Sequence, residues 1–400
     1  MSTDFRRTVL NGLTKRAPIR RTHSRWLAVL ATGLGLAASV QAQLPPEAIP
    51  NVKRIATPYP PSYAVVHDFA FGSLIDSSFS LVDTESRRFM GMMSAGQFAT
   101  VTFALGRQEF YVGETIHSRG TRGERQDVVA VYDFANLALV AEIDLPPQRA
   151  NTVVNKANTA VTADERFLLI WNQNPGTSVA VIDLDSRTIV SEVPTPGCAL
   201  VYPDEARGFM MLCGNGALLS VKLDEAGQPA SIEPSDPFND IDADPLSEKA
   251  SKINGVWHFV TYQGEVQPVD TSAETPVVGS RWWLADAEQR AQNWRPAGWH
   301  GTAGHDSGLL WVGMTPDGYP GSHKDPAPEI WLFDVEAKAR LARFDLRVPA
   351  LSIDASVHDE PRLLVVNIEG QLDIYDGKSG AYLRTIGALG ETPYMVHAIH

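Results

Sequence analysis

Two cysteines offer the first candidate chemistry in this chain of 400 residues. Cys198 and Cys213 are the only cysteines, and a polar turn at 203–208 separates the apolar runs that carry them. The N-terminal segment is typical of export, and in exported chains two such cysteines form a bond far more often than they act as a nucleophile or hold a metal ion. The sequence therefore predicts a structural disulfide between them.

Histidines and a triad-like run were the other candidates for chemistry. His300 and His305 match no zinc pattern in their spacing. The run 304–308, Gly-His-Asp-Ser-Gly, contains the residue types of a hydrolase triad, but residues so close in sequence do not normally take triad geometry. A nucleophile elbow is absent as well. We predict a turn at 304–308, no metal site, and no catalytic residue in this chain.

Tryptophans gather in the segment 281–305, which holds four of the nine in the protein. Packing inside the core is the ordinary interpretation of a tryptophan. The alternative is an aromatic rim that binds a partner or an apolar substrate, and the neighbouring Arg295, Pro296 and Gly298 favour it. We therefore predict that Trp294, Arg295 and Trp299 face a partner.

A repeated strand pattern must position these residues. The run 129–146 alternates apolar and polar residues up to Asp133, passes a polar turn and alternates again, which is typical of a two-stranded hairpin. Successive copies are 39 to 64 residues apart. Seven copies occur, at 79–93, 129–146, 179–193, 218–232, 266–279, 330–346 and 372–386. Dense β-branched and aromatic runs precede several copies, as expected for buried inner strands.

The number and spacing of the copies predict an all-β fold, a seven-bladed β-propeller, rather than a solenoid or a β-sandwich. The lone strand at 392–400 has no hairpin after it, and the strand at 63–71 begins a blade with no strand before it. We expect the C-terminal strand to pair with the N-terminal blade, which closes the ring and leaves no open edge.

The N-terminus determines the compartment and the domain boundaries. Residues 1–42 have the basic stretch, the short apolar run and the small-residue cleavage site of a signal peptide. The proline-rich segment 43–62 predicts an extended arm, and 63–400 form the propeller domain. The full chain has a net charge of −13, and removing its basic leader makes it more acidic. We therefore expect neither nucleic acid nor a membrane as a partner.

Several stretches resemble the heavy (α) subunit of quinoprotein amine dehydrogenases, the family of methylamine and aromatic amine dehydrogenases. The likeness covers the whole mature chain, including the paired cysteines. It is carried by the runs at 118–133, 198–223, 293–305 and 321–334. The stretches 258–266 and 316–331 are more similar to the aromatic amine branch than to the methylamine branch.

This resemblance implies a periplasmic α2β2 assembly that converts primary amines to aldehyde and ammonia. It implies that the redox cofactor, tryptophan tryptophylquinone, lies on the small (β) subunit, and that a blue copper protein or a c-type cytochrome accepts the electrons. Family members have a phenylalanine in the wall of the substrate channel, just after a Gly-Met…Gly stretch. That stretch is 91–101 here, which puts Gln97 at this position and Phe98 one place later. Either residue is a candidate for the channel wall, and Phe98 could equally be core.

Two other function classes fit the sequence. One is a stand-alone propeller enzyme such as a lactonase, which would need polar or metal-binding residues that converge on the central axis. The other is a propeller that binds partners without catalysis. A gene for a small subunit next to the gene for this chain would favour the dehydrogenase over both of these classes.

Overall fold

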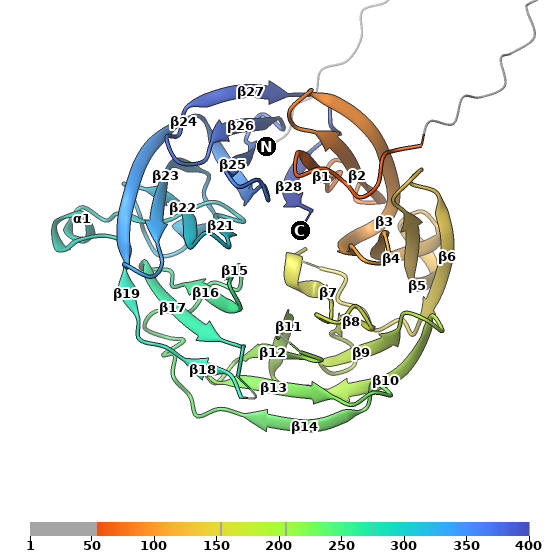
Figure 1. The fold of residues 1–400 in the computed structure, drawn as a ribbon. Coiled ribbons are helices and arrows are strands. Elements are labelled where there is room, and N and C mark those ends of the chain that lie inside the picture. The colour runs from red at the N-terminus through yellow and green to blue at the C-terminus, as the bar shows by residue number, and fades with distance from the viewer. Residues whose placement is uncertain (1–53, 153, 205, 274, 400) are drawn as a thin grey trace, which may run out of the picture. The chain divides into compact units, whose positions relative to one another are not determined.

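The computed structural model describes residues 54–399 except 153, 205 and 274, and these residues belong to a compact unit of residues 52–400. The predicted signal peptide and the first part of the proline-rich arm lie outside the described residues. The described part is all-β, with antiparallel sheets and very little helix. Figure 1 shows the sheets side by side around a common centre, with β7, β11, β15, β21 and β28 nearest to it.

The first sheet joins the two ends of the described chain. Its order is β28-β1-β2-β3-β4-β5-β6. The strands are β1 (Tyr63–Asp68), β2 (Asp76–Asp83), β3 (Arg88–Ala104), β4 (Glu109–Arg119), β5 (Arg122–Asp133), β6 (Leu139–Leu145) and β28 (Pro393–Ala398). The early part of β3 pairs with β2 and its later part with β4, so this one long strand serves two groups of strands.

Three sheets follow in chain order. The first contains β7 (Thr159–Val161), β8 (Phe167–Asn172), β9 (Ser178–Asp183) and β10 (Thr188–Pro194), preceded by the 3-10 helix η1 (Lys156–Asn158). The second contains β11 (Cys198–Pro203), β12 (Gly208–Cys213), β13 (Leu218–Leu223) and β14 (Pro229–Pro234). The third contains β15 (Ser251–Ile253), β16 (Val256–Val260), β17 (Glu265–Asp270), β18 (Val277–Val278) and β19 (Trp282–Trp283).

The last sheet holds the remaining strands. They are β20 (Arg295–Pro296), β21 (Thr302–His305), β22 (Leu309–Thr315), β23 (Ala327–Asp334), β24 (Ala339–Ala355), β25 (Arg362–Asn367), β26 (Leu372–Asp376) and β27 (Tyr382–Ile386). The helix α1 (Ala287–Ala291) and the 3-10 helix η2 (Ser322–Lys324) lie in the connections. No helix among the described residues is long and apolar enough to cross a membrane.

The repeated aspartates form the hairpin turns that the sequence predicted. In each turn the carboxylate accepts hydrogen bonds from backbone N–H groups two or three residues further on, which offers the chain a turn in place of a continued strand. Asp133 accepts in this way from Ala135 and Asn136. Hydrogen bonds from Ser272 and Ser379 lower the pKa of Asp270 and of Asp376 respectively. The fourth copy has Lys222 instead, and its turn is made by Asp224, which accepts from Ala226 and Gln228.

The core lies between the faces of neighbouring sheets. Val181 of β9 and Val221 of β13 belong to one buried cluster, and Val260 of β16 belongs to another with Leu310 of β22. Strands covered on both faces in this way bury nearly every apolar side chain, and full burial of one valine or leucine contributes about 1.5–3 kcal/mol. This layered packing makes the strands a rigid support for the loops that join them.

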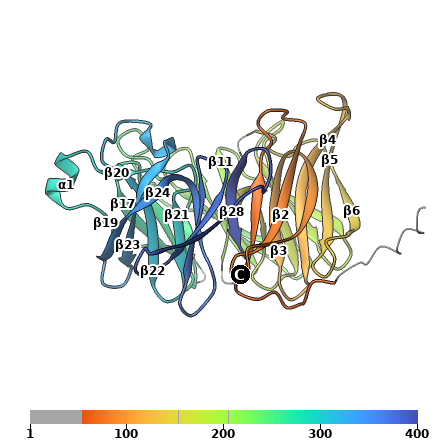
Figure 2. The same cartoon turned by 90° about the horizontal axis from the view of Figure 1, so that it is seen from above.

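Both ends of the described chain are tied down. β28 pairs antiparallel with β1, with Val66 opposite Val396, and the view from above shows the two strands side by side (Figure 2). At the N-terminal end, Ile55 donates a backbone hydrogen bond to Ala135, and Tyr59 stacks on Phe134 with ring centroids 4.5 Å apart. The described part of the proline-rich arm therefore packs against the first sheet.

Candidate functional site

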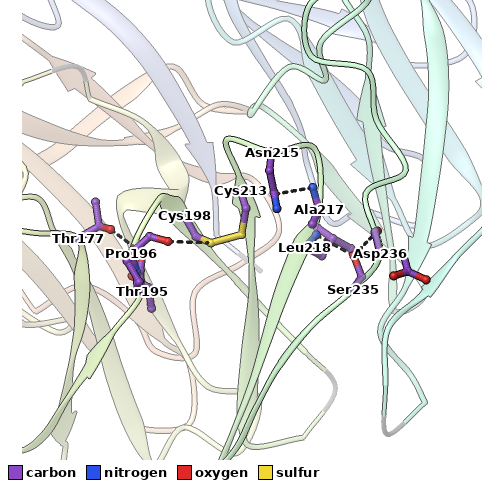
Figure 3. Close-up of a disulfide and its surroundings, with 10 residues drawn as sticks. All are labelled: Thr177, Thr195, Pro196, Cys198, Cys213, Asn215, Ala217, Leu218, Ser235 and Asp236. Carbon is purple, nitrogen blue, oxygen red and sulfur yellow. Dashed lines mark hydrogen bonds between the residues drawn. A yellow bond between two sulfur atoms is a disulfide. The ribbon is translucent and has the colours of Figure 1, made fainter.

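The two cysteines form the predicted disulfide. Cys198 of β11 and Cys213 of β12 are paired directly across the two antiparallel strands, with their Cα atoms 4.0 Å apart (Figure 3). The bond joins strands that already pair with each other. Its role is therefore structural.

The triad-like run forms a turn, as predicted. The backbone N–H of Gly308 donates to the carbonyl of His305, and Nδ1 of His305 lies 2.7 Å from Oγ of Ser307. The carboxylate of Asp306 points elsewhere and accepts from the backbone N–H of Asn254 at 2.8 Å. Asp306 and Ser307 of this turn thus bond to different residues.

A β-bulge in β3 sets the positions of Gln97 and Phe98. Gln97 is opposite Thr115 and Thr100 is opposite Gly113, so β3 has one residue more than β4 between these pairs. Phe98 takes a φ of 48°, in the left-handed region, which costs a residue other than glycine roughly 1–3 kcal/mol. Bulges of this kind re-aim side chains and occur frequently beside active sites.

The side chains of the bulge point in different directions. The amide of Gln97 donates to the carbonyl of Leu74 at 2.8 Å and accepts from Asn151 at 3.4 Å, so this side chain is used within its own chain. Phe98 is half-buried and packs against an apolar group made of Phe69, Val154 and Met395. The structure therefore gives Phe98 a partly exposed apolar ring and gives Gln97 a structural hydrogen-bonding role.

Five aromatic residues gather around the bulge, and we call them the aromatic cluster: Phe69, Phe71, Phe98, Tyr394 and Trp299. Tyr394 lies at its centre, with ring centroids 5.1 Å from those of Phe69 and Phe71 and 5.9 Å from that of Trp299. Phe98 and Tyr394 pack against the same buried group. Phe71 is 44% exposed. The predicted channel residue Phe98 and the predicted partner-facing residue Trp299 are thus linked through Tyr394 and the buried group.

The other predicted partner-facing residues lie in a different environment. Trp294 is only 7% exposed and packs in the core, with its ring 5.1 Å from that of Trp331. The guanidinium of Arg343 lies 4.3 Å above the Trp294 ring. Because this ring is buried within the chain's own core, it is not available to a partner. The prediction that Trp294 faces a partner is therefore corrected. Arg295 is half-buried in the short strand β20 and, with Trp299, remains a candidate.

A polar cavity of about 310 Å³ is lined by inner strands and by η1. Of its charged residues, Lys156 contacts Asp354 at 2.7 Å and Glu248 contacts the neighbouring Lys249 at 2.6 Å, while Lys252 donates to the carbonyls of Pro203 and Asp204. His300 also lines the cavity. Burial, reinforced by the charges of Lys156 and Lys249, lowers the pKa of His300 well below its ordinary value, so this imidazole is neutral at pH 7.

A metal ion or a quinone would place specific requirements on the described side chains. Among the described residues no group of three or more histidine, cysteine, aspartate or glutamate side chains could hold a metal ion. The close pair Trp294 and Trp331 is buried in the core and covered by Arg343, so its rings have no access to a substrate. What the site offers is an apolar, aromatic surface beside a bulge, which suits shaping a pocket rather than moving protons.

Comparison with known proteins places this geometry in a family. Residues 63–400 match the model of the methylamine dehydrogenase heavy chain (MADH). The chain belongs to the methylamine dehydrogenase heavy chain family. The heavy chain of Methylophilus methylotrophus is 26% identical over 329 residues, which are 80% of this chain and 79% of that protein. The heavy chain of Paracoccus versutus is 26% identical over 334 residues, which are 83% of this chain and 78% of that one.

A solved structure outside this family has a similar fold. The dihydro-heme d1 dehydrogenase NirN, solved in complex with DHE, superimposes with a TM-score of 0.52 at 15% identity, over 85% of this chain and 66% of that chain. At this identity the likeness concerns the fold alone. Membership of the heavy chain family therefore rests on the sequence match, and this chain is a subunit of an amine-oxidising oxidoreductase by homology.

The sequence could have indicated part of the aromatic cluster. Tyr394 lies in the C-terminal strand that the sequence identified, and Phe69 and Phe71 follow the first strand, but nothing in their spacing relates them to Phe98. Contacts between segments about 300 residues apart are visible only once β28 is paired with β1. The aromatic cluster of this family member could therefore be recognised only from the tertiary structure.

Proposed function

We propose that this chain is the heavy subunit of a periplasmic amine dehydrogenase that converts primary amines to aldehyde and ammonia. The observation that carries the proposal is the family match over residues 63–400. Tryptophan tryptophylquinone on a small subunit would supply the chemistry by accepting two electrons from the amine. This chain contributes no catalytic residue, and its residues bind the partner and shape the entrance for substrate.

We also propose that residues 63–400 form a closed propeller of seven blades. The pairing of β28 with β1 supports closure, as does the buried cluster that joins Ala64 and Val66 to Leu364 and Val366. The shared strands β3 and β24 divide the first and last sheets into two groups each, and the three middle sheets make up the remaining blades. A closed ring leaves no strand edge for aggregation.

Phe98 is the residue we assign to the wall of the substrate channel. Its half-buried ring packs against Phe69, Val154 and Met395, whereas the hydrogen bonds of Gln97 to Leu74 and Asn151 hold that side chain away from this role. The other aromatic side chains around it favour flat, apolar substrates. We therefore propose that arylalkyl amines are better substrates than methylamine.

The small subunit is proposed to dock beside Phe98. Its docking surface would consist of the exposed part of the aromatic cluster, which includes Trp299, and of Arg295. Aromatic and arginine side chains dominate the binding energy of many interfaces, and a ring whose orientation is fixed loses little entropy on binding. Lys249 lies 4.8 Å from the Trp299 ring and Tyr394 packs on its edge, which fixes the indole. The assembly would be an α2β2 heterotetramer that passes electrons to a blue copper protein or a c-type cytochrome.

A lactonase-like enzyme or a purely binding propeller is the alternative. The polar cavity would be the site of such an enzyme, but both of its carboxylates, Asp354 and Glu248, are held in ion pairs and its His300 is buried. The family match gives no support to this alternative.

Co-expression with the small subunit encoded in the same genome tests the proposal. The purified complex should reduce a redox dye when an amine is added, and the heavy chain alone should be colourless and inactive. Quinone staining of the heavy chain itself would contradict the proposed division of labour. Lactone hydrolysis by the heavy chain alone, without amine-dependent dye reduction by the complex, would favour the alternative.

A further inference from the structure

A buried arginine lies directly beneath the bulge that presents Phe98. Arg149 is 1% exposed, and its Nη2 donates to the carbonyls of Gln97 and Phe98 at 3.1 and 3.0 Å. The same nitrogen lies 3.2 Å from the hydroxyl of Thr115, the residue opposite Gln97 on β4. One guanidinium thus contacts two successive carbonyls of the bulge and the strand beside it.

These carbonyls need such a donor. The extra residue of the bulge takes β3 out of register with β4 at 98–99, so the ladder supplies no regular partners there. A buried carbonyl without a partner is costly, and a charged donor forms shorter and stronger bonds than a neutral one. Both bonds come from the one nitrogen Nη2 of Arg149, at the end of a side chain long enough to reach the two oxygens.

The arginine is itself fixed by its surroundings. Its backbone N–H donates to the carboxylate of Asp127 at 3.0 Å, and its carbonyl accepts from Arg125 at 2.8 Å. Asp127 is fully buried and also accepts from Thr115 and Arg125. This network joins the loop after β6 to both strands of the β4–β5 hairpin.

A second buried, ionisable side chain, that of Glu114, also contacts the bulge. The backbone N–H of Gly96 donates to the carboxylate of Glu114, which is 5% exposed. Burial raises the pKa of Glu114 and lowers that of Arg149, and the opposite charge of each residue partly offsets the shift of the other. Donor and acceptor groups of residues 96–98 are therefore held by two buried side chains of opposite charge, which suits a fixed bulge rather than a mobile loop.

We propose that Arg149 is a positioning residue: by holding the carbonyls of Gln97 and Phe98 it keeps the Phe98 ring aimed at the substrate channel. This inference rests on the proposed function, in which Phe98 lines that channel. Arg149 touches neither substrate nor quinone in this scheme and acts on specificity through the backbone of the bulge. Its loss should change which amines are preferred rather than reduce all rates equally.

The test compares Arg149→Met, which keeps the length of the side chain but removes every donor, with Arg281→Met. Arg281 is a matched control because it also forms several hydrogen bonds, to Gln267, Glu265 and Asn239, but in another sheet. Hydrogen exchange of residues 96–100 should accelerate in Arg149→Met and not in Arg281→Met. In the assembled complex, Arg149→Met should change the ratio of kcat/KM for arylalkyl and short alkyl amines by about 10-fold or more, as expected for a reshaped apolar pocket.

A double-mutant cycle separates positioning from general destabilisation. In a Phe98→Ala background the ratio should no longer respond to Arg149→Met, because no ring remains to be aimed. If Arg149→Met does not fold, Arg149→Lys replaces it: its ammonium keeps the charge but ends a shorter side chain than Nη2 of the guanidinium, so a smaller change in the same direction is expected.

The two readouts distinguish this inference from the proposed function. Unchanged exchange at 96–100 would overturn the role of Arg149, and so would faster exchange with an unaltered substrate ratio in an active complex. A wild-type complex that oxidises no amine would instead refute the proposed function, and exchange would then decide alone whether Arg149 holds the bulge.

Discussion

The indole of Trp299 packs edge-on against the ring of Tyr394, with ring centroids 5.9 Å apart and an interplanar angle of 70°. Trp299 lies in the tryptophan-rich segment between β20 and β21. Tyr394 lies in β28, the C-terminal strand, which pairs with β1. Tyr394 also packs with Phe98 against the same buried group. The predicted partner-facing residue Trp299 and the predicted channel residue Phe98 therefore both belong to the aromatic cluster.

Replacing Phe98 tests the channel wall. In the assembled complex, Phe98→Ala should change kcat/KM unequally for arylalkyl and short alkyl amines, by about 1–3 kcal/mol in transition-state free energy. Stability should change little because the ring is half-buried. The control is Phe110→Ala in β4, a fully buried ring whose loss should cost about 3–5 kcal/mol of stability. Equal changes for all amines in Phe98→Ala would remove this residue from the channel.

Trp299 is expected to be important for binding the small subunit. Trp299→Ala should weaken the complex by about 2 kcal/mol or more, the range of an interface hot spot, as measured by calorimetry or surface plasmon resonance. Trp283→Ala is the matched control, since Trp283 is 40% exposed and has Arg290 above its ring at 4.4 Å, but lies outside the aromatic cluster. Similar losses in the two variants would argue against a specific surface around Trp299.

The disulfide should stabilise the chain without being required for the fold. It closes a loop with a sequence separation of 15, which corresponds to about 3 kcal/mol in the chain-entropy model. Chemical denaturation of the Cys198→Ser, Cys213→Ser double variant should show a loss of that order. The fold should survive because β11 and β12 still pair at Tyr202↔Met210 and bury both side chains. Two free thiols in the unfolded, unreduced wild type would refute the bond.

Stability should fall as the pH drops below about 6.5. Burial lowers the pKa of His67 and His300 well below the ordinary value, and it lowers the pKa of His258 to about 4. Below pH 6.5 the unfolded chain therefore binds protons that the folded chain does not, and each such group removes up to about 1.4 kcal/mol per pH unit. The contribution of these groups is complete above pH 6.5 and is lost progressively towards their folded-state pKa values.

The pH effect can be assigned to single residues. Denaturation of wild type and of His300→Asn at several pH values between 7.5 and 5 should give a shallower slope for the variant, by about one proton. The window lies above the range in which most carboxylates titrate, so histidines dominate it. A slope that is the same in both proteins would show that His300 does not titrate differently on unfolding.

The elements of this fold could be predicted from the sequence because their causes are local. Alternation of apolar and polar residues determines which face of a strand is buried, and aspartate at the end of a strand offers its carboxylate to the next turn. Asp133 and Asp376 form such turns as expected. The pairing of Cys198 with Cys213 was predictable for a similar reason, since the turn between them places their strands side by side.

The candidate site was decided by contacts that local patterns do not encode. Trp294 and Trp299 are close neighbours in sequence, yet the first is buried beneath Arg343 and the second packs on Tyr394. The left-handed bulge at Phe98 depends on a guanidinium about 50 residues away in the chain. Both arrangements follow from long-range packing, in which burial and hydrogen bonding are satisfied by residues that only the tertiary structure brings together. The sequence determined the strands and the family, and the fold determined which side chains meet.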